Sequence, residues 1–333
     1  MRAFPATPAE EEKWDDLVAS LPRPHVLQSK EWATVKEGGG WRTRRFVLRD
    51  DAGALEGIAQ VLVREIAAGL RYAYAPRGPL LTRDERVGEA ARALAGALRG
   101  SGALALLVDP ELPVSHAAAL ARAGCRPAGP VQPRRTLVVD LAPEAQELLG
   151  AMRRKTRQYI RKAERDGVAT AESEDIGTFY DIERVVSERN RFAIHDRAYF
   201  ESVWRTFAPA GRAHLFFASV ERRPVATLLV LHWGAYAWEM FGGWNGEFPE
   251  MRPFYLLKWR AMLRLRQLGV RSYDMWGLAD SSRPDDPLAG VESFKLGFGG
   301  EEREYVGSWE IAVQPLLFPL WRAAARVRRA ALA

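Results

Sequence analysis

Cysteine is almost absent from this chain. Of its 333 residues only Cys125 is a cysteine, so no internal disulfide can form and a cysteine-based metal cluster is excluded. No apolar run approaches the ~18 residues that span a membrane. The acidic N-terminal stretch MRAFPATPAEEEKWDD lacks the apolar core of a secretory signal. We therefore expect a cytoplasmic protein in which Cys125 is a small buried residue.

The motifs of several common enzyme classes are also missing. There is no H-E-x-x-H pair, no G-x-S-x-G turn and no G-x-x-x-x-G-K-[ST] loop. Their absence argues against a zinc hydrolase, an α/β-hydrolase and a P-loop nucleotidase. The histidines do not cluster at metal-ligand spacing: His25, His116, His195, His214 and His232. We expect no bound metal, and a reaction that needs little covalent help from the protein.

What the chain does contain is a high apolar content and an excess of positive charge. Hydrophobic residues make up 47% and charged residues 27%, which is a globular composition, and the length suits two domains. The net charge of +6 favours a polyanionic partner, although a genomic bias toward arginine would also produce it. The placement of the cations therefore decides between these two explanations.

The same order of elements occurs twice along the chain. Strand patterns at 45–48, 58–63 and 71–76 precede a helical pattern at 87–98 and a strand pattern at 103–108. Later, strand patterns at 215–220, 225–232 and 236–241 precede a helix at 254–268 and a strand at 271–276. In that second helix we expect Lys258 to lie beside the apolar stripe, off the buried face. The repetition indicates an internal duplication.

This element order predicts an α/β (α+β) fold with mixed sheets flanked by helices. It is the order of an N-acetyltransferase-like (GNAT) core, present here in tandem. We expect a first domain at 1–142 and a second at 143–313, with a C-terminal helix at 314–333 that packs back on the first. The R/Q-x-x-G-x-G/A turn that holds the pyrophosphate of coenzyme A is missing from both halves. Coenzyme A is therefore disfavoured, and no cofactor is expected.

The densest positive charge lies on one expected helix between the two halves, at 143–166. Its basic face is a candidate track for a phosphate backbone, or else a solvated helix face. The cations proposed to contact such a backbone are Arg153, Arg154, Lys155, Arg157 and Arg161. The C-terminal helix also has an apolar stripe flanked by arginines, which suits either an anionic membrane surface or docking on its own domain.

Four segments spread over nearly the whole length resemble the Fem family of non-ribosomal peptidyl transferases, which build peptidoglycan cross-bridges. They are LQSKEWATVKEGGGW at 27–41, YAPRGPLL from Tyr74, KTRQYIRKAERDGV from Lys155, and a fourth, discontinuous segment. That fourth segment comprises RPFYLLKW at 252–259, YDMWGL at 273–278 and SFKLGFGGEEREYVGSWE at 293–310. The resemblance implies two acetyltransferase-like domains, in agreement with the duplication. The helical coiled-coil arm that some members carry in the second domain has no room in this chain.

The resemblance also implies a reaction. An amine of a peptidoglycan stem peptide attacks the ester of an aminoacyl-tRNA, and glycine, alanine or serine is transferred to form a cross-bridge. The acceptor is UDP-MurNAc-pentapeptide or lipid II, and we expect a monomer. Three alternatives stay open at this point: a small-metabolite acceptor, an acyl-coenzyme A N-acyltransferase, and an RNA-binding module without enzymatic activity.

By the same resemblance Lys295 is the cation that stabilises the oxyanion and the tRNA acceptor end, with Phe294 packed beside it. Lys36 is the contact to the diphosphate of the precursor. Four further residues are assigned to the substrate groove: Tyr255, Tyr199, Tyr74 and Arg77.

One position departs from the family pattern. Where the family's basic phosphate contact is expected this chain has His195, which is mostly neutral at pH 7. Either Arg197 makes that contact or phosphate binding is weaker. No residue is clearly a general base, although Asp109 and Asp274 follow corresponding strands and are candidates.

Overall fold

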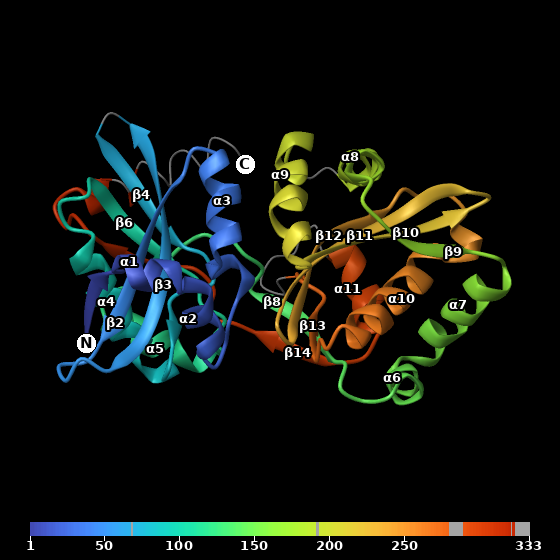
Figure 1. Cartoon of the computed structure of the whole chain (residues 1–333), viewed down its shortest axis with the longest axis horizontal. Helices are drawn as coiled ribbons and strands as arrows, with labels where there is room; N and C mark the ends of the chain where they lie inside the picture. The colour runs from blue at the N-terminus through green and yellow to red at the C-terminus, as the bar shows by residue number, and fades with distance from the viewer. Residues whose placement is uncertain (68, 191–192, 280–288, 321, 324–333) are drawn as a thin grey trace. The chain divides into compact units, whose positions relative to one another are not determined.

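The computed structural model describes residues 1–67, 69–190, 193–279, 289–320 and 322–323. The chain divides into two compact units (Figure 1). Unit 1 is formed by Met1–Gln132 and the segment that begins at Glu304, and unit 2 by Pro133–Arg303. The boundaries expected from the sequence, after residues 142 and 313, each lie later in the chain.

Two short strands explain this difference. Strand β8 (Arg135–Asp140) pairs with β13 (Ser272–Asp274) and so belongs to the sheet of unit 2. Strand β15 (Trp309–Ala312) pairs with β6 (Ala103–Val108) and so belongs to the sheet of unit 1. Each strand is too short for its partner to be identified from its own sequence.

The described part of unit 1 contains an eight-stranded sheet with the order β1-β2-β3-β4-β6-β15-β7, and β5 pairs with β3. Its other strands are β1 (Arg2–Pro5), β2 (Arg42–Arg49), β3 (Leu55–Ala67), β4 (Leu70–Ala75), β5 (Leu80–Leu81) and β7 (Arg126–Pro127). Strands β2, β3 and β4 are antiparallel, whereas β4 and β6 are parallel.

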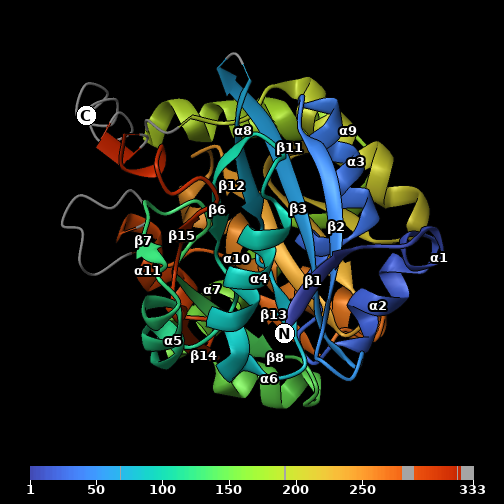
Figure 2. The same ribbon diagram turned by 90° about the vertical axis from the view of Figure 1, so that its left-hand side faces the viewer.

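Helices cover both faces of this sheet. Helices α4 (Val87–Ala97) and α5 (Ala117–Arg122) cover one face and enclose an apolar core (Figure 2). Helices α1 (Pro8–Glu12), α2 (Trp14–Ser20) and α3 (Lys30–Gly38) precede the main strands, and α3 packs on β2 and β3. The apolar stripe expected at 87–98 is therefore the buried face of α4.

Unit 2 repeats this plan. Its described residues form a seven-stranded sheet with the order β14-β8-β13-β12-β11-β10-β9. The added strands are β9 (Ala169–Ser173), β10 (Ala213–Val220), β11 (Arg223–Trp233), β12 (Tyr236–Trp244) and β14 (Glu301–Glu304). As in unit 1, two antiparallel pairs are followed by a parallel one, here β12 with β13. The expected α/β fold with two tandem acetyltransferase-like sheets is confirmed.

Two layers of helices flank the sheet of unit 2. Helices α7 (Arg154–Arg165) and α10 (Pro253–Gln267) pack on one face, and α8 (Ile176–Asn190) packs against β11 and β12, with α9 (Arg197–Phe207) beside it (Figure 1). The helix expected at 143–166 is in fact two helices, α6 (Ala145–Ala151) and α7. The break lies at Met152 and Arg153, where the Arg153 N–H donates to the carbonyl of Gly297 at 2.9 Å.

The segment at 304–313 does not form a single strand. Strand β14 ends at Glu304 in the sheet of unit 2, and β15 begins at Trp309 in that of unit 1. Gly307, with φ of +73°, lies between them and permits a left-handed backbone. The chain changes sheets within this segment.

Most of the expected C-terminal helix, at 321 and 324–333, lies outside the described residues. In the part that is described, Phe318 is buried and Arg322 donates to the carbonyl of Pro127 at 3.2 Å, within unit 1. Among the helices whose residues are described, none combines the length and the apolar character that crossing a bilayer requires.

Gln28 links the first two sequence motifs. Its side chain is fully buried, and its Nε2 donates to the carbonyl of Pro76 at 2.7 Å and to that of Gln60 at 3.2 Å. Its Oε1 accepts the N–H of Gln60 at 2.7 Å. A buried amide with every group bonded holds the segment after β4 against the one before α3.

Replacing Gln28 with leucine is expected to lower the free energy of unfolding by about 3 kcal/mol, because three buried backbone groups lose their partner. Denaturant titration of the purified variant measures this loss. The matched control is Gln267→Leu at an exposed position, which should change stability little. Equal stability of the two variants would show that the Gln28 bonds are replaced by other contacts.

Candidate active site

Lys295 lies on α11 (Ala289–Leu296) in unit 2 and is partly buried. Its Nζ donates to the carbonyl of Gly277 at 2.8 Å and also to that of Trp276. Both residues of this turn have left-handed backbones, with φ of +52° at Trp276 and +43° at Gly277. A bulky residue in that region is strained and needs support from its surroundings.

Asp274 provides this support. Its Oδ1 accepts the N–H of Trp276 at 2.6 Å and the hydroxyl of Thr136. The carboxylate at the end of β13 thus fixes the turn whose two carbonyls hold the ammonium of Lys295. The sequence made Asp274 a candidate general base. In the structure its Oδ1 instead accepts the hydrogen bonds that hold this turn.

The surroundings of Lys295 weaken its hold on a proton. Burial, together with the nearby charge of Lys258, lowers the pKa of Lys295 to about 8. The carboxylates of Glu239 and Asp274 act in the opposite direction. Lys295 is therefore mostly cationic at pH 7 and becomes neutral as the pH rises above about 8.

Aromatic side chains surround the neighbouring Phe294. Its ring stacks on Phe254, with centroids 5.3 Å apart, and meets Tyr255 edge-on at 4.7 Å. Tyr255 in turn meets Tyr159 of α7 at 4.9 Å. Lys155 lies over the Tyr159 ring, 5.6 Å from its centroid. The structure thus brings Phe294, Lys295 and Tyr255 together, and an aromatic series connects them to the basic helix.

Beneath these rings lies an ion pair that the sequence did not reveal. Lys258 of α10 is fully buried and pairs with Glu239 of β12, whose other oxygen accepts the hydroxyl of Tyr273 at 2.6 Å. The expectation that Lys258 lies off the buried face was wrong, because a buried carboxylate provides the partner that an ammonium needs. A lysine within the apolar stretch RPFYLLKW and a glutamate within YAWEMFGGW were the available signals.

A second buried carboxyl, Glu183 of α8, lies near Glu239. Burial and the charge of Glu239 raise the pKa of Glu183 to about 8. Within the described residues its Oε1 has no hydrogen-bond partner. Glu183 is therefore protonated at neutral pH.

Replacing Glu183 with glutamine is expected to remove a pH dependence of stability. Between pH 4.5 and about 8 the folded protein keeps a proton that the unfolded chain releases. Stability therefore falls as the pH rises, by up to ~1.4 kcal/mol per unit. Denaturant unfolding at pH 5, 6.5 and 8 should show this slope in the parent and in the exposed control Glu188→Gln, but much less in Glu183→Gln. Parallel slopes in all three would contradict this assignment.

Three of the predicted substrate contacts lie on α9 or just before it: His195, Arg197 and Tyr199. The rings of His195 and Tyr199 stack with centroids 3.7 Å apart. Burial raises the pKa of Tyr199 well above its ordinary value. Arg197 is exposed, and its Nε lies 2.7 Å from Glu201. The structure thus brings His195 and Tyr199 together, whereas Arg197 pairs with Glu201, and contact of all three with a substrate stays a prediction.

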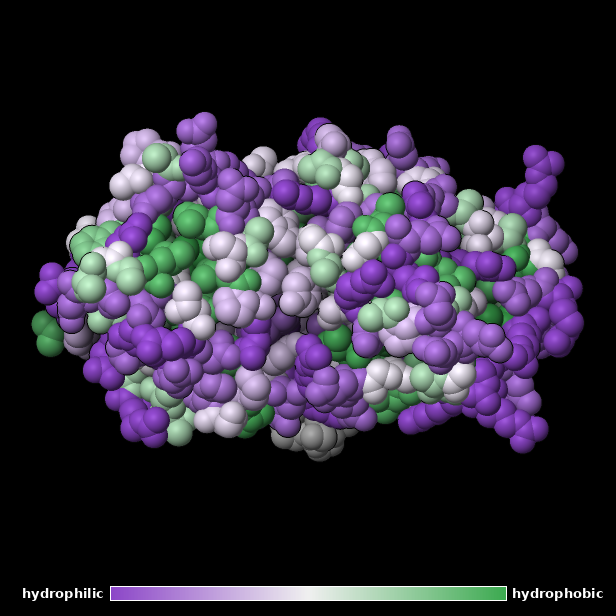
Figure 3. All heavy atoms as spheres, turned by 60° about the horizontal axis from the view of Figure 1, so that its bottom comes forward, coloured by the Kyte–Doolittle hydropathy of each residue, from purple (hydrophilic) through white to green (hydrophobic). Residues whose placement is uncertain are grey.

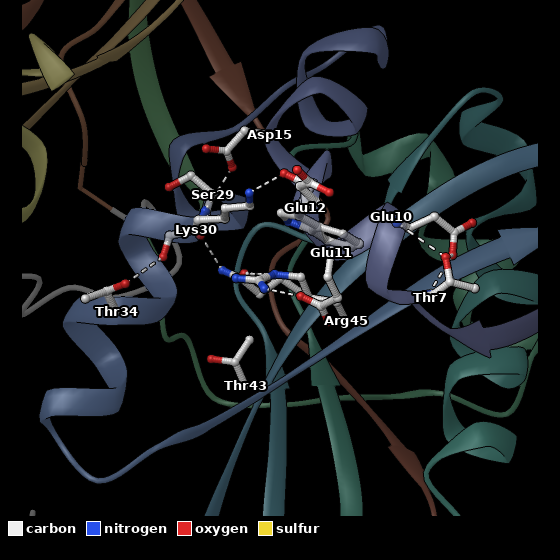
Figure 4. Close-up of polar contacts among 12 residues, drawn as sticks. Thr7, Glu10, Glu11, Glu12, Asp15, Ser29, Lys30, Thr34, Thr43 and Arg45 are labelled. Carbon is white, nitrogen blue, oxygen red and sulfur yellow. Dashed lines mark hydrogen bonds and ion pairs between the residues drawn. The ribbon is translucent and has the colours of Figure 1, made fainter.

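Lys36 lies near the end of α3 in unit 1. Its Nζ is 4.7 Å from the centroid of the Trp32 ring, and burial lowers the pKa of Lys36 to about 8. The start of this helix is held by polar contacts to the N-terminal helices, among them the Lys30 N–H bond to Asp15 at 3.0 Å (Figure 4). The ammonium of Lys36 thus lies on a helix whose start is fixed by hydrogen bonds.

Tyr74 and Arg77 are buried in unit 1 around Asp109. The hydroxyl of Tyr74 donates to the carboxylate of Asp109 at 2.8 Å, and the backbone N–H of Arg77 donates to the same carboxylate at 2.7 Å. Burial raises the pKa of Asp109 to about 6. Arg77 is 2% exposed and has a left-handed backbone with φ of +51°. Direct contact of Tyr74 and Arg77 with a substrate stays a prediction.

The expected RNA contacts lie at the start of α7 and along it. Four of them are exposed: Arg153, Arg154, Lys155 and Arg161. Arg157 differs, because its guanidinium donates to the carbonyls of Met152 and, at 3.0 Å, Gly150 at the end of α6. The surface over α6 and α7 is predominantly hydrophilic in Figure 3. Within the described residues, no group of His, Cys, Asp and Glu side chains is arranged to hold a metal ion.

Comparison with known proteins agrees with this architecture. Residues 150–295 match the model of an acetyltransferase (GNAT) domain, and residues 9–124 match that of the FemAB family. A tandem GNAT protein from the clavulanic acid biosynthesis pathway aligns with a TM-score of 0.56 at 17% identity, over 94% of this chain and 99% of that one. The fold is thus that of a tandem acetyltransferase-like protein.

Relatives of similar length narrow this class. The chain is 26% identical to a UDP-N-acetylmuramoylpentapeptide-lysine N(6)-alanyltransferase of Weissella viridescens, over 93% of this chain and 96% of the relative. It is 22% identical to a lipid II:glycine glycyltransferase of Staphylococcus aureus (strain MRSA252), over 92% of each. The crystal structure of FemX aligns with a TM-score of 0.81 at 22% identity, over 95% of this chain and 99% of that one. The chain is thus similar over nearly its whole length to Fem-type proteins, and the FemAB family model matches its first part, in agreement with the resemblance of its motifs.

Proposed function

We propose that this protein is an aminoacyltransferase that moves glycine, alanine or serine from an aminoacyl-tRNA to an amine of a peptidoglycan precursor. The names of both relatives describe transfer of an amino acid to such a precursor, and both relatives align over nearly their whole length. The observation that carries the proposal is Lys295, a cation oriented by two carbonyls beside an aromatic cluster.

Lys295 suits the chemistry of ester aminolysis. A nitrogen–carbon bond forms as the amine adds to the ester carbonyl, and the carbon–oxygen bond to the ribose then breaks, which releases the tRNA hydroxyl. The amine loses a proton to water or to a substrate group, and negative charge develops on the carbonyl oxygen. An ammonium has three N–H donors, so two bonds to carbonyls fix the direction of the third. That third donor stabilises the oxyanion.

The exposed cations of α7 support RNA as the carrier of the donor. A row of arginines neutralises phosphates, and stacked aromatic rings accept unpaired bases. The series Tyr159, Tyr255 and Phe294 leads from this basic surface to Lys295. Arg252, 4.5 Å from the centroid of the Tyr159 ring, adds a further cation. We infer that RNA phosphates and the reacting ester bind to the same unit.

The acceptor is the precursor that the two relatives name in its nucleotide-linked or lipid-linked form. Exposed leucines near the C-terminal end of the described chain, Leu316 at 91% and Leu320 at 68%, favour a peripheral contact with a membrane that carries the lipid-linked form. Because aminoacyl-tRNA is a cytoplasmic molecule, the proposed reaction takes place on that side of the membrane.

Reconstitution tests the proposal. Purified protein, tRNA charged with a labelled amino acid, and UDP-MurNAc-pentapeptide or lipid II should give a labelled precursor, and RNase treatment before the reaction should abolish it. Persistent transfer after RNase would overturn the tRNA-dependent reaction. Labelling of small amines but not of either precursor would indicate a metabolite acceptor. Transfer from an acyl-coenzyme A in the absence of RNA would indicate an acyl-coenzyme A N-acyltransferase.

A further inference from the structure

The buried pair of Lys258 and Glu239 is costly for the fold. Lys258 is 0% exposed and Glu239 is 7% exposed, so both charges have left water. A buried ion pair commonly contributes no more stability than apolar residues of the same volume. Tyr273, which donates to Glu239, adds a third polar group to this core. The need for a stable fold therefore does not explain the pair.

Its location provides another explanation. The Nζ of Lys258 is 5.4 Å from the centroid of the Phe294 ring and 5.0 Å from that of Phe254. Phe294 directly precedes Lys295, so the pair lies under the residues proposed to act on the ester. The charges of both Lys258 and Glu239 act on Lys295, with opposite sign.

Among the described residues, other charged groups near Lys295 lie on β13, α11 and α8. Asp274 of β13 acts on it directly. On α11 itself, Glu292 is paired with Arg135 of β8 at 2.9 Å. From α8, Glu183 faces Glu239 and is protonated at neutral pH because its pKa is about 8. Lys258 and Glu239 thus provide two of the charges that act on Lys295: Lys258 lowers its pKa, and Glu239 raises it.

We propose that Glu239 and Lys258 are positioning residues that set the charge state of Lys295 and support the aromatic cluster above them. This inference rests on the proposed function only in giving Lys295 a role in the reaction. Lys258 favours the neutral amine of Lys295, and Glu239 limits that effect. Lys295 thereby stays cationic at neutral pH with an ammonium that is poorly solvated, which strengthens its attraction to a developing oxyanion.

Three variants test this inference: Glu239→Gln, Lys258→Met and the double variant that carries both. The amine of Lys295 is titrated by competitive acylation with trace acetic anhydride from pH 6 to 10, followed by mass spectrometry of the peptide that contains it. Only the neutral amine reacts, so the midpoint reports Lys295 directly and requires no enzymatic activity. The pH profile of aminoacyl transfer is then measured for the same proteins.

The two single variants should move the midpoint of Lys295 in opposite directions. Without the charge of Glu239 the midpoint should fall by about one pH unit, and without that of Lys258 it should rise by about as much. The midpoint of Lys295 in the double variant should lie between those of the two single variants. The double variant should also keep a folded core if a single variant does not. The control, Arg264→Met on the exposed side of α10, should leave the midpoint unchanged.

A structural role alone would lower thermal stability without moving the midpoints apart, and that result would overturn the inference. Shifts of both single variants in the same direction would also overturn it. Failure of the proposed function is distinguishable, because a wild-type protein without transfer activity would still show the opposed shifts in the acylation experiment.

Discussion

Replacing Lys295 with alanine is expected to slow aminoacyl transfer about a hundredfold, which corresponds to the loss of one donor to an oxyanion, ~3 kcal/mol. The effect should appear in kcat, because the ammonium interacts with charge that develops only in the transition state. Single-turnover kinetics with saturating precursor and charged tRNA measure it. The parent enzyme should also lose activity as the pH rises above about 8, where Lys295 becomes neutral.

The control for this experiment is Lys13→Ala. Lys13 is an exposed lysine of unit 1, outside the proposed substrate and tRNA contacts, so its loss should change the rate little. Circular dichroism and thermal unfolding of both variants establish that the fold is kept. A Lys295→Ala protein with the parent's single-turnover rate would remove Lys295 from the mechanism.

A triple variant of the basic helix, with glutamine at Arg154, Lys155 and Arg161, is expected to weaken tRNA binding more than about tenfold at moderate salt. These three cations are exposed, so each can contact a phosphate. Each lost contact should reduce the slope of log K against log salt by about 0.7 to 0.9. Fluorescence anisotropy with labelled tRNA, measured over a series of salt concentrations, gives both quantities.

The matched control carries the same change of charge elsewhere. Glutamine at Arg99, Arg122 and Arg205, all exposed, removes three charges outside α7. This protein should bind tRNA nearly as well as the parent. If both triple variants lose affinity equally, net charge alone accounts for binding and α7 is not the contact surface.

The repeated fold could be predicted because its signal is local. The apolar runs of β10 and β11, bounded by a turn, and the apolar stripe of α4 are patterns typical of buried strands and of a helix with one buried face. The partner strand of β8 and the partner strand of β15 could not be predicted in this way. Strands of six and four residues carry little pattern, and their partners β13 and β6 lie far away in the sequence.

The candidate site was predictable only in part. Lys295, Phe294 and Tyr255 came from the resemblance of their motifs, and the structure places them together. The left-handed turn at Trp276 carries no sequence signal, since bulky residues rarely adopt that conformation. Lys258 was interpreted as a surface cation because helical periodicity alone does not reveal a buried carboxylate on a distant strand.

The arrangement of β15 has a consequence for biosynthesis. This strand lies between β6 and β7, and all of unit 2 is synthesised before it. On the ribosome the sheet of unit 1 therefore stays incomplete, with the edge of β6 unpaired, until β15 is synthesised. The contiguous residues of unit 2 can fold before that point. Polypeptides terminated just before residue 304 should consequently leave the earlier unit vulnerable to proteolysis and the later one resistant.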